Sequence, residues 1–131
     1  MRTPAKAIRL ATGRLRDDRG QAVIEFTGTV PVILATLVLL WQAALLGYTF
    51  SLAGNAADEA ARAGAVGGAG ACQAAGQAHL PGAWTGETDC AGDGDLYTAS
   101  VRVSLPVLFP GGPNLPITVD AHGSAAWEDR P

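Results

Sequence analysis

The chain of 131 residues is rich in hydrophobic and small residues but poor in charge. Charged residues make up 16% of it, whereas about 25% is usual for globular proteins. With 25 alanines and 17 glycines it has little bulk for the core of a soluble enzyme, although its hydrophobic share of 48% is too high for a disordered chain. A net charge of -3 also argues against a nucleic-acid-binding protein, so a small membrane or secreted protein remains.

The charges are unevenly distributed along the chain. The first nineteen positions hold six of the nine basic residues and two acidic ones, a net charge of +4. Glu25 follows alone, and the segment 26–57 contains no charged residue. From Asp58 onward there are nine acidic residues and three arginines. A basic arm is thus followed by an uncharged stretch and an acidic tail.

Residues 22–46 form an apolar stretch that is predicted to span a membrane within a transmembrane helix of residues 21–48. At about 1.5 Å per residue it reaches roughly 37 Å, against a hydrocarbon core of about 30 Å. Trp41 and Tyr48 lie toward its C-terminal end, where amphipathic rings favour the interface. The preceding basic arm predicts a cytoplasmic N-terminus and an extracytoplasmic C-terminal region, with the protein in the cytoplasmic membrane.

Two other interpretations of this stretch remain open. It could be a buried helix of a soluble protein, although apolar runs of this length usually span membranes. It could also be a cleaved secretory signal, whose apolar region is about 7–15 residues long and ends at a small-residue site. The stretch here is longer, and no clear Ala-x-Ala site follows Leu46.

Glu25 is the only charged residue within the apolar stretch. A carboxylate at the centre of a bilayer costs about 2.5–3.5 kcal/mol on insertion scales, and less near the edge. Glu25 could therefore be a boundary residue that reaches water, or a functional carboxylate that requires a cation. No Lys or Arg occurs between Gly20 and Ala61, so such a cation would come from another chain or from a new N-terminus.

The residues around Glu25 carry a family resemblance. The basic leader followed by Gly20-Gln-Ala-Val-Ile-Glu-Phe26 resembles the processing site of type IV pilin-like proteins. The sequence RGQAVIEF resembles that of the TadE-like family of tight-adherence pilus assembly proteins. Pro31 and the Ala-Arg-Ala-Gly sequence that ends at Gly64 extend this resemblance over residues 17–66. Gln21 departs from the Phe that is usual at this position in type IV pilins.

The resemblance implies that a prepilin peptidase cuts between Gly20 and Gln21 and removes a cytoplasmic leader of residues 1–20. The new α-amino group at Gln21 has a reference pKa of about 7.7–8.0, so it would be largely charged at neutral pH. It could pair with Glu25 of a neighbouring subunit, in a pairing site that includes Phe26. The implied partners are the membrane, the peptidase, other pilin subunits and Tad-type assembly platform proteins, with no nucleic acid and no cofactor.

Residues 49–66 are predicted to continue as an Ala-rich helix. Small residues recur every four positions and form a face on which another helix could pack closely. The residues expected in this packing are Ala53, Ala57, Ala61, Arg62, Gly64 and Ala65. Asp58 and Arg62 have the spacing of an ion pair within a helix. The high helix propensity of Ala would by itself also explain this composition.

Residues 67–95 are expected to form a Gly-rich loop, with the helix ending at Gly64, Gly67, Gly68 and Gly70. One short helical turn is allowed near Cys72–Ala78. Cys72 and Cys90 are the only cysteines and lie on the expected outer side, which favours a disulfide over two free thiols. Such a bond would stabilise the fold by about 3 kcal/mol. Neither His79 nor His122 has zinc-ligand spacing to the cysteines.

Residues 96–131 are predicted to form an extracytoplasmic β-hairpin region. In Leu96–Leu105 apolar and polar residues alternate, as in a half-buried strand. A Pro- and Gly-rich connection precedes a second expected strand, Ile117–Trp127. Two strands alone are marginally stable, so this hairpin needs cover from the helix, the disulfide or a partner.

The sequence therefore predicts a membrane protein of the α+β class with one N-terminal transmembrane helix. No catalytic or metal-binding motif is recognisable beyond a faint calcium-loop likeness at Asp93-Gly-Asp95, and no enzyme activity is expected. The resemblance implies a TadE-like minor pilin or pseudopilin. The alternative is a signal-anchored envelope protein with a small disulfide-bonded binding domain, in which Gly20 and Glu25 are incidental.

Overall fold

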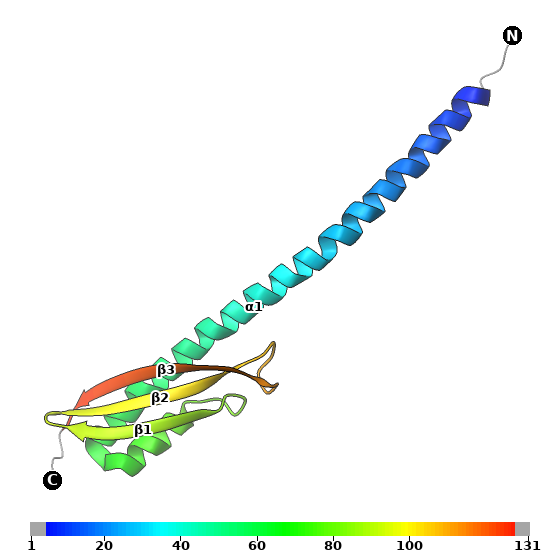
Figure 1. Cartoon of the computed structure of the whole chain (residues 1–131). Coiled ribbons are helices and arrows are strands. Elements are labelled where there is room, and N and C mark those ends of the chain that lie inside the picture. The colour runs from blue at the N-terminus through cyan, green and yellow to red at the C-terminus, as the bar shows by residue number, and fades with distance from the viewer. Residues whose placement is uncertain (1–4, 128–131) are drawn as a thin grey trace. The chain divides into compact units, whose positions relative to one another are not determined.

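The computed structural model describes residues 5–127, with side chains from Arg19 onward. It contains one long helix, α1 (Ala5–Ala78), and three strands, β1 (Gly86–Asp93), β2 (Leu96–Pro106) and β3 (Asn114–Ala126) (Figure 1). The chain divides into two units, residues 1–39 and 40–131. The first four residues of the expected leader and the last four of the expected hairpin region lie outside the described residues.

The first unit is the N-terminal part of α1, whose apolar side chains are exposed. Residues 19–78 form the one helix in the described side-chain range that is long and apolar enough to cross a membrane, and an 18-residue window within it has a mean hydropathy of 2.1. The backbone stays helical through Pro31. The Thr27 and Thr36 hydroxyls donate to carbonyl oxygens four residues earlier, at 2.8 and 2.9 Å. These bonds satisfy the hydroxyls without water, as an apolar environment requires.

The C-terminal end of α1 differs from the prediction. Of the four glycines expected to end the helix, Gly68 alone leaves the helical range, with φ 80° and ψ -170°. Only glycine adopts this conformation at little steric cost. The chain then resumes its helix as far as Ala78. The expected Gly-rich loop over 67–95 is therefore wrong, because this range holds a second helical segment and all of β1.

The second unit contains an antiparallel sheet with the order β1-β2-β3 (Figure 1). The expected hairpin is confirmed as β2 and β3, with Val103 opposite Val119. Strand β1 adds a third strand along the other edge of β2 and places Gly86 opposite Val103. The register of β2 and β3 shifts between Ser104 and Pro106, where proline has no N–H to donate.

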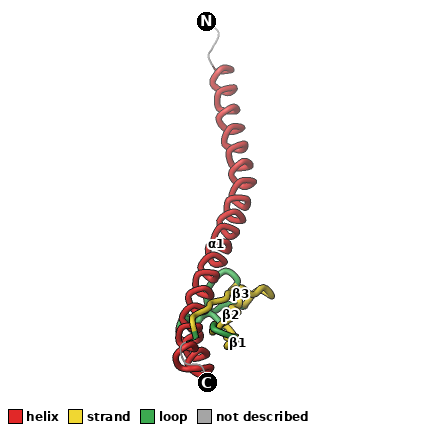
Figure 2. The backbone as a smooth tube through the Cα atoms, turned by 90° about the vertical axis from the view of Figure 1, so that its left-hand side faces the viewer, coloured by secondary structure: helices red, strands yellow, loops and turns green. Residues whose placement is uncertain are grey.

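The core lies between this sheet and α1, which runs along one face of the sheet (Figure 2). The alternation predicted for β2 is confirmed, because five inward-facing side chains are at most 4% exposed: Tyr97, Ala99, Val101, Val103 and Leu105. On α1 they meet buried small residues, namely Ala53, Ala56, Ala57, Ala60, Ala61, Gly64 and Ala65. We call these seven the small-residue face. This face packs on the chain's own sheet, which corrects the expectation of a second helix.

Two glycines show how closely the sheet and the helix approach each other. A Cβ atom on Gly123 of β3 would lie 2.6 Å from the carbonyl carbon of Ala57 and 2.7 Å from the amide nitrogen of Asp58. A Cβ atom on Gly64 would lie 2.6 Å from Cδ1 of the Tyr97 ring. Because both distances are far below van der Waals contact, larger side chains would force the sheet away from α1.

Polar contacts from the helix hold the ends of the sheet in place. The Gln42 side chain donates to the Pro106 carbonyl at 2.9 Å and accepts from the Leu108 amide at 3.0 Å. The Trp84 indole donates to the buried Thr49 hydroxyl at 3.1 Å. That hydroxyl donates in turn to the Leu45 carbonyl at 2.7 Å. These bonds join α1 to the loops before β1 and after β2.

Substitution of Gly123 by alanine tests the close approach. The added Cβ would meet helix backbone, which cannot rotate away, so we expect Gly123→Ala to lower the free energy of unfolding by about 1–3 kcal/mol. The measurement is thermal or urea unfolding followed by circular dichroism in detergent.

Gly70→Ala is the matched control, because a Cβ there meets nothing within 4 Å. This control should be neutral or slightly stabilising, since alanine favours a helix. Equal stability of the two variants would contradict the packing described here.

Candidate processing and assembly site

The four N-terminal candidate residues lie together on an exposed part of α1. Gly20, Gln21, Glu25 and Phe26 are all exposed in the first unit. A Cβ atom on Gly20 would meet nothing within 4 Å. The structure therefore leaves these residues open to an external partner.

Glu25 has a polar neighbour but no cation in the described part of the chain. The Gln21 side-chain amide donates to Glu25 Oε1 at 3.3 Å, and the Thr29 hydroxyl donates to the Glu25 carbonyl at 2.7 Å. The ion pairs among the described side chains involve Arg62 and Arg102. The negative charge of Glu25 is therefore not offset by these residues. In hydrocarbon such a carboxylate needs a partner from outside them.

The candidate packing residues divide into two groups. Ala53, Ala57, Ala61, Gly64 and Ala65 belong to the small-residue face and are buried. Arg62 does not belong to the small-residue face, because its side chain is 70% exposed. Its Nη1 lies 3.6 Å from Oε1 of Glu59. The expected pairing of Arg62 with Asp58 is replaced by this contact with Glu59. An exposed pair of this kind contributes little to stability.

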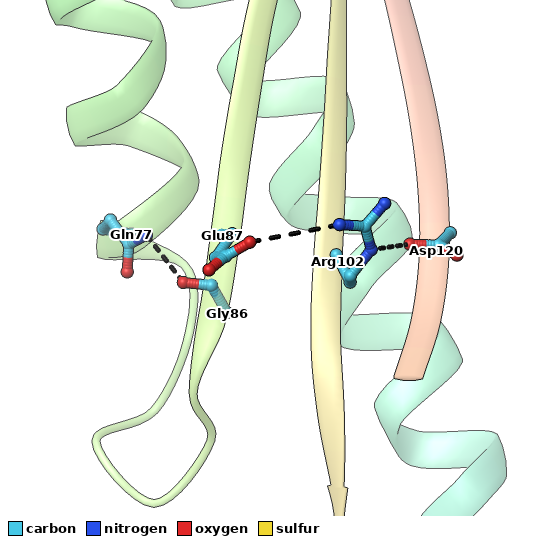
Figure 3. A network of polar contacts seen from close by, with 5 residues as sticks. All are labelled: Gln77, Gly86, Glu87, Arg102 and Asp120. Carbon is cyan, nitrogen blue, oxygen red and sulfur yellow. Dashed lines mark hydrogen bonds and ion pairs between the residues drawn. The ribbon is translucent and has the colours of Figure 1, made fainter. Parts of the chain in front are cut away.

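The two cysteines form a disulfide in the structure. Cys72 lies in the helical segment after Gly68, Cys90 lies in β1, and their Cα atoms are 6.4 Å apart. The Gln77 side chain donates to the Gly86 carbonyl at 3.0 Å in the same region (Figure 3). The disulfide and this bond hold the edge strand β1 against the end of α1.

The outer face of the sheet carries a polar network. Arg102 of β2 lies between the two neighbouring strands, with Nε 2.8 Å from Asp120 Oδ1 and Nη1 4.0 Å from Glu87 Oε2 (Figure 3). The hydrogen bond that Arg102 donates to Asp120 raises the pKa of Arg102 above its ordinary value. The Ser100 hydroxyl lies 2.7 Å from His122 Nδ1 on the same face. These groups are exposed, so their pairing mainly favours the strand register.

Among the described residues, no three His, Cys, Asp or Glu side chains lie close enough together to hold a metal ion. His79 Nδ1 lies 3.0 Å from the Ala75 carbonyl, within its own helical segment.

These features define a class of protein, in which an apolar helix able to cross a membrane continues into a small disulfide-bonded α+β unit. Residues 20–62 match the family model of the TadE-like protein. The match confirms the TadE-like family predicted from the sequence, over the segment that holds Glu25 and most of the small-residue face. The family suggests an association with tight-adherence pili and with the membrane. No curated protein and no solved structure matches the chain.

Sequence reasoning missed three features that shape this arrangement. Strand β1 was missed because its sequence GETDCAGD is polar and glycine-rich, with only half-buried inward positions. The contacts of Gln42 and Trp84 were missed because they join residues far apart in the sequence. The role of Gly123 could have been predicted from the sequence, since a glycine inside a strand often marks the close approach of another backbone.

Removal of the disulfide tests its role in holding β1. We expect Cys72→Ser combined with Cys90→Ser to lower the free energy of unfolding by about 3 kcal/mol, because the unfolded chain regains the entropy of an open loop. The measurement is urea unfolding with and without reductant.

Reductant should lower the stability of the unsubstituted protein to that of the double variant and leave the variant unchanged. Ala74→Ser, an exposed position in the same helical segment, is the control and should unfold like the unsubstituted protein. If reductant had no effect on the unsubstituted protein, the disulfide would not support the fold.

Proposed function

We propose that this chain is a minor pilin or pseudopilin, a non-enzymatic single-span subunit of a tight-adherence pilus or a related secretion machine. The observation that carries the proposal is the five-residue spacing of Gly20 and Glu25 on an exposed helix, within the segment that matches the TadE-like family. The packing of the second unit adds support, because its small-residue face is used internally while the large apolar side chains of the first unit remain exposed.

The first step of the proposed function is cleavage between Gly20 and Gln21 by a prepilin peptidase on the cytoplasmic side. Gly20 suits this step because it has no side chain and its surroundings are open, so a protease can reach the backbone. Cleavage removes the basic leader and creates an α-amino group at Gln21. That group has a reference pKa of about 7.7–8.0 and is therefore largely positive at neutral pH.

The second step is pairing between subunits. Glu25 has no cation among the described side chains, so a neighbouring subunit's new α-amino group would offset its charge. The pairing would compensate two groups that are each costly to desolvate alone. Phe26 lies beside Glu25 and is exposed, so it would contact the same neighbour. Tad-type platform proteins would supply the assembly machinery, with the N-terminus in the cytoplasm.

Mass spectrometry of the mature protein tests the cleavage step. In cells with the prepilin peptidase, we expect the N-terminus to begin at Gln21, and in cells without it to retain the leader. Gly20→Leu should block cleavage because its side chain occupies the space beside the scissile bond. Gly28→Leu is the matched control, since Gly28 is equally open in the same unit and lies beyond the cleavage site. An intact leader in both kinds of cell would overturn the processed-pilin proposal.

Glu25 variants test the pairing step. We expect Glu25→Ala and Glu25→Gln to insert in the membrane normally but to reduce pilus assembly strongly, because each removes the charge that the amine would meet. Gln21→Ala is the matched control: it removes the side-chain bond to Glu25 but keeps the α-amino group, so assembly should persist. The readouts are membrane fractionation and the amount of sheared pili. Normal pili with Glu25→Gln would contradict charge pairing.

A further inference from the structure

The second unit has an exposed apolar surface that its fold does not explain. We call it the apolar tip and define it as Trp41 of α1 together with the β2–β3 loop, residues 107–113. In this tip Trp41 is 53%, Leu108 44% and Phe109 56% exposed. Exposed apolar patches of this kind in a soluble unit usually mark an interaction surface.

The tip lies at the uncharged end of the unit. Between Arg102 and Asp120, which pair across β2 and β3, the chain contains no charged residue. On the helix, no charged residue occurs from 40 to 57. The described charged residues of this unit therefore lie beyond those two borders: Asp58, Glu59, Arg62, Glu87, Asp89, Asp93, Asp95, Arg102 and Asp120.

The backbone of the loop is already hydrogen-bonded within the unit. The amides of Val107 and Gly112 donate to the carbonyls of Pro113 and Phe109, at 2.8 and 3.2 Å. The Phe109 amide donates to the Val107 carbonyl at 2.6 Å. Residues 110 and 113 of this loop are prolines without N–H groups, so most backbone donors of the loop are either absent or already bonded. The loop can therefore enter a membrane–water interface with few unpaired donors.

The loop is also fixed on the helix. The Leu108 amide donates to Gln42 Oε1 at 3.0 Å, and its carbonyl accepts from the Trp41 indole. Leu108 has a φ of 60°, which is unfavourable for a residue with a side chain. These bonds hold the Leu108 backbone in place despite that conformation, and the Leu108 and Phe109 side chains remain exposed.

The position of Trp41 in the sequence identifies the partner of the tip. Residues 22–41 are twenty residues of helix, and at about 1.5 Å per residue they reach about 30 Å, the thickness of a hydrocarbon core. Trp41 thus lies toward the end of the apolar stretch 22–46, about one hydrocarbon thickness from its start, and indole rings favour the membrane–water interface. Through the indole bond, the loop lies at the same level as Trp41.

We propose that the apolar tip inserts into the outer membrane–water interface, so that Leu108 and Phe109 contact lipid. The partner is a lipid surface, and the proposal rests on the membrane anchoring included in the proposed function. Before assembly, the sheet is held on the bilayer at two points, the helix and the loop. The charged end of the unit, which includes Asp93, faces water.

Spin labelling of the full chain in phosphatidylcholine–phosphatidylglycerol vesicles tests this proposal. Because both cysteines are in the disulfide, a ketone-bearing amino acid carries the nitroxide. The labelled positions are Phe109, Leu37 in the span and Leu96 in the charged end, which are 56%, 56% and 50% exposed in the structure. Collision rates are measured with oxygen, which enters lipid, and with a water-soluble nickel complex.

We expect the Phe109 label to resemble the Leu37 label, with frequent oxygen collisions and loss of most nickel collisions, while the Leu96 label stays accessible to nickel. If the Phe109 label were as accessible to nickel as the Leu96 label while the Leu37 label stayed protected, the insertion of the tip would be overturned. The membrane anchoring by the helix would still stand. Nickel access at Leu37 would overturn the anchor as well. If the Phe109 label were protected from nickel only in samples that also show spin–spin broadening, a second copy of the chain would be covering the tip. That result would also overturn the proposal.

Discussion

The close contact between the small-residue face of α1 and the three-stranded sheet is the constraint on which the second unit depends. Gly123 lies against the backbone of Ala57, and Tyr97 lies over Gly64, so backbone and ring occupy space that ordinary side chains would fill. The core therefore gains its packing density from small residues rather than from bulk. This explains how a chain with so few large hydrophobic residues outside its span builds a folded unit.

The same helix suits two environments because its side chains change along its length. Up to Trp41 the large apolar residues are exposed and suit lipid, whereas from Ala53 to Ala65 the small residues are covered by the sheet. These two segments of the helix cannot exchange roles. Contact with lipid favours large apolar side chains, whereas the close approach of a sheet to the helix backbone requires small ones. The large apolar side chains of the N-terminal part, together with Glu25, thus remain exposed.

Several elements could be predicted from local sequence alone. The span follows from an uncharged run, β2 follows from strict alternation, and the Cys72–Cys90 bond follows from two cysteines on the expected outer side. Strand β1 could not be predicted, because its polar and glycine-rich sequence has the composition of a loop and becomes a strand only through pairing with β2. The choice of Gly68 among four glycines as the break in α1 could not be predicted either, because any of the four could adopt its positive φ.

The sequence by itself determined the order of charge and apolarity along the chain, and with it the candidate span, the Gly20–Glu25 spacing and the resemblance to the TadE-like family. Each of these depends on residues that are neighbours in the chain, so local periodicity and composition contain the information. Only the tertiary structure decided that the small-residue face is covered by its own sheet and that the β2–β3 loop lies beside Trp41. Those contacts join residues more than thirty positions apart, and their geometry depends on strand register and close packing that no local pattern encodes.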